Sequence, residues 1–217
     1  MTGSFEAHLL TIGHSNLPAD RFMALLKEHG VTTVVDVRSV PFSRRFPWFS
    51  SRTLSERLQS KGIGYVMMGD TLGGRPDDPA LYRNNSADYD AMAATAEFQT
   101  GIERVLAQAA RHRLCLMCAE REPLDCHRCL LVGRALARCG CSVGHILGDG
   151  TVEPHPATEE RLIATLRLPA ADLFADRPTR LDEAYRRRAA KIAARLSDRV
   201  RPGRTPRMRG SKAFISS

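Results

Sequence analysis

Several signals that assign a protein to a class are missing from this 217-residue chain. It contains no run of about 18 apolar residues, so no membrane span is expected. It contains no internal repeat and no G-x-G-x-x-G fingerprint, which excludes a repeat architecture and the usual dinucleotide-binding loop. The first eight residues lack a basic start followed by an apolar segment, so we expect no signal peptide and a cytoplasmic location.

The composition is that of a water-soluble globular protein, with 43% hydrophobic and 26% charged residues. The length allows one domain of about 150 to 180 residues plus an extension. We expect an α/β domain that carries the site over residues 1–150 and accessory helices packed on it over 151–200. A mobile basic tail is expected over 201–217.

The net charge of +8 is concentrated at the C-terminal end. Residues 177–217 hold 13 Lys and Arg against three acidic residues, a net charge of +10. Residues 1–176 hold 19 basic and 21 acidic residues, a net charge of −2. The extension alone is therefore a candidate for non-specific contact with nucleic-acid phosphates, and a solvated helix is the plain alternative.

Short β-rich runs alternate with helical stretches along residues 8–147. This alternation predicts a three-layer α/β/α fold with a mainly parallel, Rossmann-like sheet of about five strands, plus a helical basic C-terminal extension. The expected strands are His8–Gly13, Thr32–Val37, Gly64–Met68, Arg113–Cys118 and Ser142–Leu147. The expected helices are Ala19–His29, Thr53–Lys61, Tyr89–His112, Cys126–Cys139, Thr158–Leu168 and Leu181–Val200.

Polar or glycine-rich residues follow every predicted strand. Ligands in open parallel sheets bind beyond the carboxyl ends of the strands, so we expect these residues to share one edge. In strand order the segments are Gly13–Asn16, Asp36–Ser39, Asp70–Arg75, Cys118–Glu120 with Cys126–Arg128, and Gly148–Gly150.

Several of these segments together resemble the family called domain of unknown function 488. The resemblance covers roughly residues 8–150 and depends on an ordered set of short motifs. The motifs are Thr-Ile-Gly-His-Ser-Asn (11–16), Asp-Val-Arg (36–38) followed by Pro41, Leu-Gly-Gly (72–74), Cys-Ala-Glu (118–120) and Cys-His-Arg (126–128). The resemblance implies a fold and a site, but the family name assigns no reaction. The family pattern implies a small hydroxyl residue at position 129, and Cys129 departs from it.

The densest chemistry lies between Cys118 and Arg128. An apolar strand ends at Cys118, a charged loop with Glu120 follows, and Asp125 is expected to open a helix. Near the helix N-terminus, Arg128 is a candidate for binding phosphate or carboxylate. The alternative is that Arg128 pairs with Glu120 or Glu122 and ties the loop.

Candidate reacting groups surround this position. His127 is a candidate proton shuttle near neutral pH, with Glu120 as its partner or as a second base. Cys126 is a candidate nucleophile, since a helix N-terminus and an adjacent imidazole both lower the pKa of a thiol. Cys118, at the end of the strand, is assigned to substrate binding.

We expect the six cysteines to be thiols, because the cytosol is reducing. Cys115-x-x-Cys118 and Cys126-x-x-Cys129 have the crude spacing of a four-thiolate zinc site. However, Cys115 and Cys118 lie three apart on a strand and so point to opposite faces. The Cys115-x5-Arg121 spacing of cysteine phosphatases fails for a related reason, because Cys115 would be buried inside the strand. We therefore expect no metal and no cofactor.

Residues after the first two strands complete the predicted crevice. His14 and Asp36 are candidate catalytic residues, and Ser15 and Arg38 are candidate substrate-binding residues. Asp36 and Arg38 lie two apart on a strand and share a face, which also fits a buried ion pair. For His14 the alternative is a hydrogen bond within the loop.

Two further segments are candidates for ligand contact. Gly73 and Gly74 are assigned to substrate binding, because glycine permits close backbone approach to a ligand, or a tight turn. The run Arg44–Phe49 combines cations with aromatic rings, as nucleic-acid surfaces do, although its aromatic rings also fit a loop anchored to the core.

These observations lead to an enzyme of the hydrolase or transferase class that acts on a phosphate-bearing or nucleotide-like substrate by acid–base chemistry. Two other classes stay open. One is a non-catalytic nucleic-acid-binding module that uses the basic extension. The other is a thiol-dependent or redox protein that uses Cys118 and Cys126. The oligomeric state does not follow from the sequence.

Overall fold

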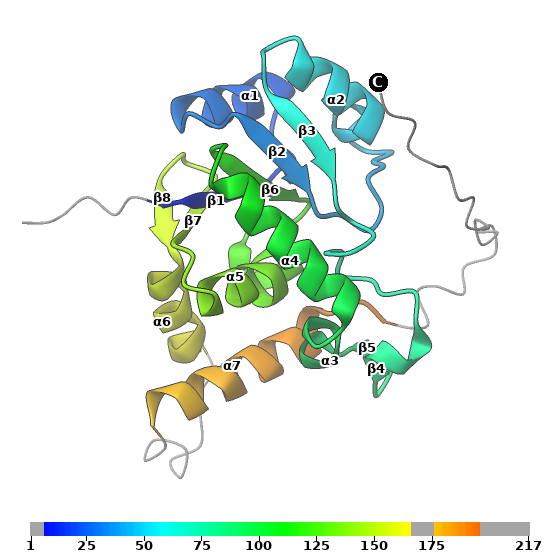
Figure 1. Ribbon diagram of the computed structural model, residues 1–217, viewed down its shortest axis with the longest axis vertical. Coiled ribbons are helices and arrows are strands. Elements are labelled where there is room, and N and C mark those ends of the chain that lie inside the picture. The colour runs from blue at the N-terminus through cyan, green and yellow to red at the C-terminus, as the bar shows by residue number, and fades with distance from the viewer. Residues whose placement is uncertain (1–6, 166–175, 196–217) are drawn as a thin grey trace, which may run out of the picture.

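The computed structural model describes residues 7–165 and 176–195, and a six-stranded sheet forms its centre (Figure 1). The strand order is β3-β2-β6-β1-β7-β8. Only β8 runs antiparallel to its neighbour. In chain order the strands are β1 (Leu9–Gly13), β2 (Thr33–Asp36), β3 (Gly64–Met67), β6 (Leu114–Cys118), β7 (Val143–Ile146) and β8 (Val152–Pro154). The α/β class and the mainly parallel sheet are confirmed, with one strand more than expected.

Helices cover both faces of this sheet. The strand β6 shows why, because all five of its residues are buried. Leu114, Leu116 and Cys118 face one apolar cluster, to which α4 (Ala96–Ala109) and α5 (Arg134–Arg138) contribute. Cys115 and Met117 face the other cluster, to which α1 (Ala19–Glu28) and α2 (Ser51–Gln59) contribute. Central parallel strands are apolar on both sides for this reason.

The stretch expected as one helix over Tyr89–His112 is two helices. α3 (Tyr89–Ala93) ends before Thr95, and α4 begins at Ala96. The Thr95 hydroxyl accepts a hydrogen bond from the backbone N–H of Phe98, as an N-cap residue does. Upstream of these helices, β4 (Tyr82–Arg83) and β5 (Ser86–Ala87) form a small separate hairpin.

Two helices follow the last strand. α6 (His155–Thr165) begins three residues earlier than expected, so Thr158 lies inside it, where its hydroxyl donates to the Glu153 carboxylate. α7 (Arg177–Ile192) begins after Asp176, whose carboxylate accepts from the backbone N–H of Thr179. The predicted tail over 201–217 lies outside the described residues.

A buried polar chain ties α6 and α7 to the sheet. Thr11 of β1 contacts His145 Nδ1 at 2.8 Å, and His145 Nε2 contacts His155 Nδ1 at 3.0 Å. His155 Nε2 then contacts the Tyr185 hydroxyl at 3.0 Å, and this hydroxyl donates to Glu159. The five side chains form hydrogen bonds with one another, which lets polar groups lie inside the core.

Each helix in the described ranges is too short or too polar to span a membrane.

Candidate functional site

The carboxyl ends of the parallel strands meet at one edge, and a cavity of about 340 Å³ lies there. Gly13, the last residue of β1, pairs in register with Cys118, the last residue of β6. Asp36, at the end of β2, pairs with Met117. The cavity is lined by side chains from several of these ends, among them Arg38, Arg75, Cys118, Glu120 and His127.

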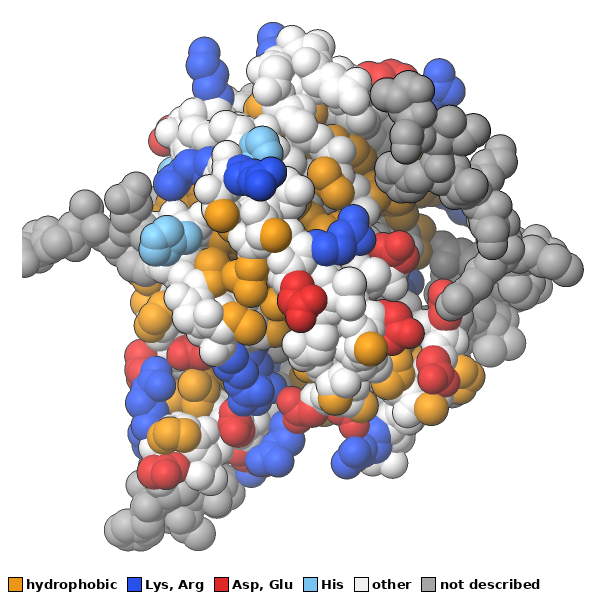
Figure 2. Space-filling view, in the orientation of Figure 1, with side chains coloured by type: hydrophobic (Ala, Val, Ile, Leu, Met, Phe, Trp, Pro, Cys, Tyr) orange, Lys and Arg blue, Asp and Glu red, His pale blue; other side chains and the backbone are white. Residues whose placement is uncertain are grey.

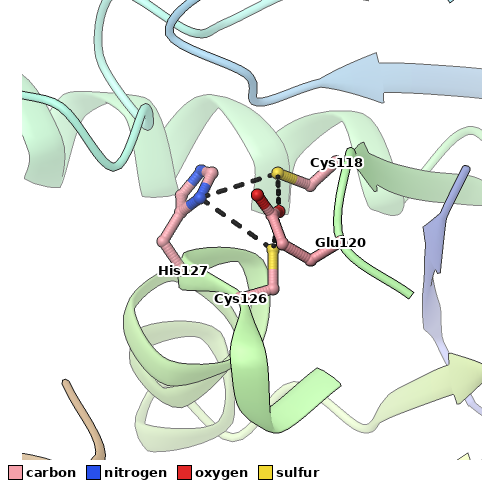
Figure 3. Close-up of side chains that lie close together, drawn as sticks. All are labelled: Cys118, Glu120, Cys126 and His127. Carbon is pink, nitrogen blue, oxygen red and sulfur yellow. Dashed lines mark hydrogen bonds between the residues drawn. The ribbon is translucent and has the colours of Figure 1, made fainter. Parts of the chain in front are cut away.

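Four side chains converge at the wall of this cavity, and we call them the Cys–His–Glu cluster (Figure 3). Its members are Cys118, Glu120, Cys126 and His127. Both thiols donate to the same carboxylate oxygen, Glu120 Oε2, at 3.0 Å from Cys118 and 2.9 Å from Cys126. His127 Nδ1 lies 3.6 Å from Cys118 Sγ and 4.0 Å from Cys126 Sγ. One sulfur, oxygen or nitrogen atom from each residue lies within 4.8 Å of all the others.

The chain between β6 and the following helix brings these residues together. After Cys118 the loop turns through a short 3-10 helix, Pro123–Asp125. Cys126 has extended backbone angles, and the helix starts at His127, one residue later than expected. Its first part, Arg128–Gly133, is a π-helix, a rare form that is frequent at functional sites.

Backbone contacts hold the His127 ring in one orientation. Nε2 donates to the carbonyl of Val37 at 2.9 Å, which leaves Nδ1 directed at the two thiols. Gly74 packs against the same ring, and a Cβ on Gly74 would lie 2.7 Å from its Cγ. Gly73 is equally constrained, because a Cβ there would lie 2.3 Å from Ser39 Oγ. These glycines allow close approach of the loop to the site wall.

Arg128 lies behind the loop and has no exposed surface. Its two Nη atoms donate to the backbone carbonyls of Glu120 and Arg121, at 2.6 and 2.9 Å. Arg128 therefore holds the loop in place, as the alternative to anion binding predicted. It does so through backbone carbonyl oxygens and not through the carboxylates of Glu120 or Glu122. Gly13 permits this path, since a Cβ there would lie 1.7 Å from the Glu120 carbonyl oxygen.

Arg38 is held at the cavity wall by a buried network. Asp36 accepts two hydrogen bonds from the guanidinium, at 2.8 and 2.6 Å, and a third from the Tyr65 hydroxyl at 2.6 Å. His14 contacts Arg38 Nη1 through Nε2 at 3.2 Å, and its Nδ1 lies 3.0 Å from the Ser15 carbonyl. Asp36 and His14 thus orient Arg38 and do not themselves line the cavity.

His14 is held in the neutral form. Burial, together with the Arg38 cation, lowers its pKa to about 4. Its ring also stacks on Phe49, with centroids 4.2 Å apart. A neutral imidazole can donate to the Ser15 carbonyl while it accepts from Arg38, which matches both contacts. The Ser15 hydroxyl bonds to Asn16 and does not line the cavity.

The cluster divides its charge unevenly. Burial and the hydrogen bond to Cys126 raise the pKa of the Cys118 thiol. Against the effect of burial, the hydrogen bond to Cys118 and the Arg128 cation hold the pKa of Cys126 well below its usual range. Burial also opposes a charge on His127, but the neighbouring Cys126 raises its pKa. Burial and Cys126 raise the pKa of Glu120. Of the two thiols, Cys126 is therefore the more acidic.

The remaining cysteines of the central stretch are not part of this site. Cys115 faces the opposite apolar cluster from Cys118, as strand geometry predicts. Cys129 Sγ lies 3.8 Å from His145 Nε2, in the core. The four-thiolate arrangement is therefore not formed. Cys115 is fully buried, and burial raises the pKa of its thiol, so the phosphatase-like spacing has no reactive thiolate.

Three side chains that form or support the cavity are not among the candidates predicted from the sequence. Arg75 and Tyr89 line the cavity, and Tyr65 supports Asp36. Arg75 follows the Gly73-Gly74 pair, so its place beyond the third strand was a usable signal. Nothing local marks Tyr65 or Tyr89, because their roles depend on strand pairing and helix packing.

The family model described as domain of unknown function DUF488 matches residues 18–135, which span the second, third and fourth expected strands and the cluster. No curated protein and no solved structure matches the chain.

Proposed function

Because this chain belongs to the family of domain of unknown function DUF488, whose name assigns no reaction, we propose its function from the site alone. The protein is an enzyme that binds a phosphate-bearing, nucleotide-like substrate in the cavity at the carboxyl edge of the sheet. Arg38 and Arg75 hold the anion, and the Cys–His–Glu cluster supplies the reacting groups. The reaction class is hydrolase or transferase.

One observation carries this proposal. Two arginine side chains and three members of the cluster line the same cavity. Its volume of about 340 Å³ is within the range of small-molecule sites, roughly 300–1,000 Å³. A cavity that pairs cationic side chains with titratable groups is a typical active-site arrangement.

The two arginines are suited to different parts of anion binding. A guanidinium has five N–H donors, and three of those of Arg38 are directed to Asp36 and His14, which leaves two for a ligand. Because Asp36 fixes its plane, Arg38 can make an oriented contact with a phosphate. Arg75 is exposed and contributes attraction at the mouth of the cavity.

A panel of phosphate compounds tests the proposal. The melting temperature of the full-length protein is measured with inorganic phosphate, nucleoside monophosphates and nucleoside diphosphates. We expect at least one compound to raise it, and Arg75→Ala to reduce the rise at the same ligand concentration. Arg104→Ala is the matched control, because Arg104 is an exposed arginine of α4 outside the cavity. No stabilisation of the wild-type protein by any compound would refute the proposal.

The nucleic-acid-binding alternative is weakened by ion pairs along α7. Arg177 pairs with Glu160 at 2.6 Å, Arg187 with Glu183 at 2.6 Å, and Arg188 with Asp125. Figure 2 shows acidic and basic side chains interspersed over this part of the molecule. At least three of the five arginines of α7 are thus paired with carboxylates, which reduces the positive charge that this helix offers to a phosphate backbone.

The thiol-dependent alternative uses the same wall but predicts a free, reactive sulfur. Cys118 lines the cavity, whereas Cys126 is almost fully buried behind it. Rapid alkylation of Cys118 by iodoacetamide at neutral pH, faster than that of the exposed Cys139, would favour this alternative.

A further inference from the structure

We propose that the Cys–His–Glu cluster binds one divalent metal ion of the zinc class. The ion would lie in the wall of the substrate cavity, so its role in the reaction rests on the proposed function. The binding of the ion itself does not depend on that function. Four donor atoms from the four residues converge there, and all of them lie within 4.8 Å of one another.

The separations of the donor atoms fit a tetrahedral ion. Zinc lies about 2.3 Å from sulfur and about 2.0–2.1 Å from nitrogen or oxygen, which places ligand atoms roughly 3.3–3.8 Å apart. The observed sulfur–nitrogen distances are 3.6 and 4.0 Å, and the sulfur–oxygen distances are 3.0 and 2.9 Å. Shifts of less than about 1 Å would give each atom its place around one ion.

Hydrogen bonds within the cluster already direct all four donor atoms toward one another. Both thiols already share Glu120 Oε2. His127 donates through Nε2 to the Val37 carbonyl, so in the neutral ring Nδ1 keeps its lone pair and lies within hydrogen-bond reach of both sulfurs. A cation at the centre satisfies this lone pair, both sulfurs and the carboxylate at once.

The surroundings of His127 are those of a metal ligand. Histidines that bind metals almost always donate the other ring N–H to a carbonyl or carboxylate, which fixes the tautomer. The Val37 carbonyl accepts this hydrogen bond from His127 Nε2 at 2.9 Å, and Gly74 packs against the ring. His127 is therefore held with Nδ1 directed at the site before any ion binds.

The local charge is also balanced by such an ion. Two thiolates, one carboxylate and one divalent cation sum to a charge of −1. Arg128 is fully buried, and its side-chain hydrogen bonds go to neutral carbonyls, so its cation needs a compensating negative charge nearby. The metal-loaded cluster supplies that charge.

The chemical types of the four donor atoms favour zinc, and the position of Glu120 suggests a catalytic role for the ion. Two sulfurs with one imidazole and one carboxylate suit zinc and exclude calcium and magnesium, which require oxygen ligands. Glu120 is exposed at the cavity, although its carboxylate reaches inward to the two thiols, whereas Cys126 is almost fully buried and does not line the cavity. The carboxylate is therefore the ligand that a substrate oxygen can replace, as an exchangeable position of a catalytic zinc requires.

A second group of candidate ligands serves as the internal control. Cys129, His145 and His155 also lie close together. There, every ring nitrogen has a hydrogen-bond partner in the chain from Thr11 to Tyr185. We expect this group to bind no ion.

The test is metal titration of the full-length protein purified with a reductant and freed of metal with a chelator. Zinc binding is followed by equilibrium dialysis with elemental analysis, and Co²⁺ by its visible and thiolate charge-transfer absorption. We expect one ion per chain and a tetrahedral Co²⁺ spectrum with sulfur ligation. Cys126→Ser and Cys118→Ser should weaken zinc binding by more than about 100-fold, and Glu120→Gln by about 10- to 100-fold. Cys129→Ser and Cys139→Ser should bind as the wild type does.

Three results would overturn the proposal. The first is that the wild-type protein binds no stoichiometric amount of zinc. The second is an unchanged affinity for zinc in a Cys126→Ser variant that keeps its circular dichroism spectrum. The third is loss of zinc binding in Cys129→Ser alone. Glu120→Gln guards against misfolded variants, because glutamine keeps the size of the side chain and an oxygen that accepts from both thiols. Phosphate-dependent stabilisation is measured on the same samples. Stabilisation without metal binding refutes this inference only, and metal binding without stabilisation refutes the proposed function only.

Discussion

His127 donates through Nε2 to the carbonyl of Val37 at 2.9 Å, and this contact joins the cluster to β2. Val37 follows the last residue of β2, and His127 starts the helix that follows β6. The position of the imidazole therefore depends on how the ends of β2 and β6 lie relative to each other. Any change that moves its ring should disturb both the cavity and the cluster.

Gly74→Ala should move that ring. A Cβ at this position would lie 2.7 Å from His127 Cγ, closer than unbonded atoms allow. We expect a loss of about 1–3 kcal/mol in the free energy of unfolding, measured by urea denaturation, and weaker zinc binding. Gly148→Ala is the control, because its Cβ would meet Arg121 Cδ at an ordinary 3.7 Å. Equal stability of the two variants would show that the Gly74 contact is not tight.

Asp36→Asn should be far more damaging than the loss of a surface ion pair. Asp36 holds Arg38 at 2.6 Å in a pair that is at least 95% buried on both sides. Removing one partner of a buried pair leaves an uncompensated charge and costs about 3–5 kcal/mol. Glu56→Gln, in the exposed pair with Arg52, should cost less than about 1 kcal/mol. Chemical denaturation of both variants measures the contrast, and similar losses would contradict it.

Stability should fall as the solution is acidified from about pH 6.5 to pH 4. Burial lowers the pKa of His155 to about 4, and that of His14 to about 4 with help from Arg38. The unfolded chain takes up protons on these residues near pH 6.5, whereas the folded chain does so only near pH 4. Each contributes stability that is complete above pH 6.5 and lost towards pH 4, at most about 3 kcal/mol.

A His155 variant tests this assignment. In the folded protein His155 faces His145, the Tyr185 hydroxyl and the carboxylates of Glu159 and Glu153. His155→Gln removes its titration, so the free energy of unfolding should depend less steeply on pH over this range, although the variant is less stable at pH 7. An unchanged slope would show that His155 is not held neutral in the folded state.

Shortening the chain separates the body from the basic end. A protein ending at Arg195 keeps α7, whose Tyr185 is buried against His155. We expect it to fold with the melting temperature of the full-length chain and to lose most non-specific binding to nucleic acid, with a shallower dependence on salt. Undiminished binding would place the nucleic-acid contact on the folded body instead.

The sequence predicted the parts of this site that depend on local pattern. Alternating strands and helices fixed the α/β class, and parallel strands brought Asp36 and Cys118 to one edge. The three-residue spacing of Cys115 and Cys118 correctly separated them onto opposite faces. These outcomes follow from the period of a strand and from strand direction, which need no tertiary information.

Other features depended on contacts that no local pattern encodes. Whether Arg128 faces the cavity or the loop is decided by the path of the Glu120 carbonyl over Gly13. The start of the helix at His127 depends on the turn before it. The strand order places β6 between β2 and β1, so the neighbours of Cys118 come from distant parts of the chain.

The central claim is that the cavity binds a phosphate-bearing ligand through its arginines. Isothermal titration calorimetry of the most stabilising phosphate compound into wild-type protein, Arg75→Ala and Arg104→Ala tests it most directly. We expect saturable binding of one ligand per chain to the wild type and Arg104→Ala, and at least tenfold weaker binding to Arg75→Ala. Equal affinity in all three proteins would show that the anion binds elsewhere and that the cavity is not its site.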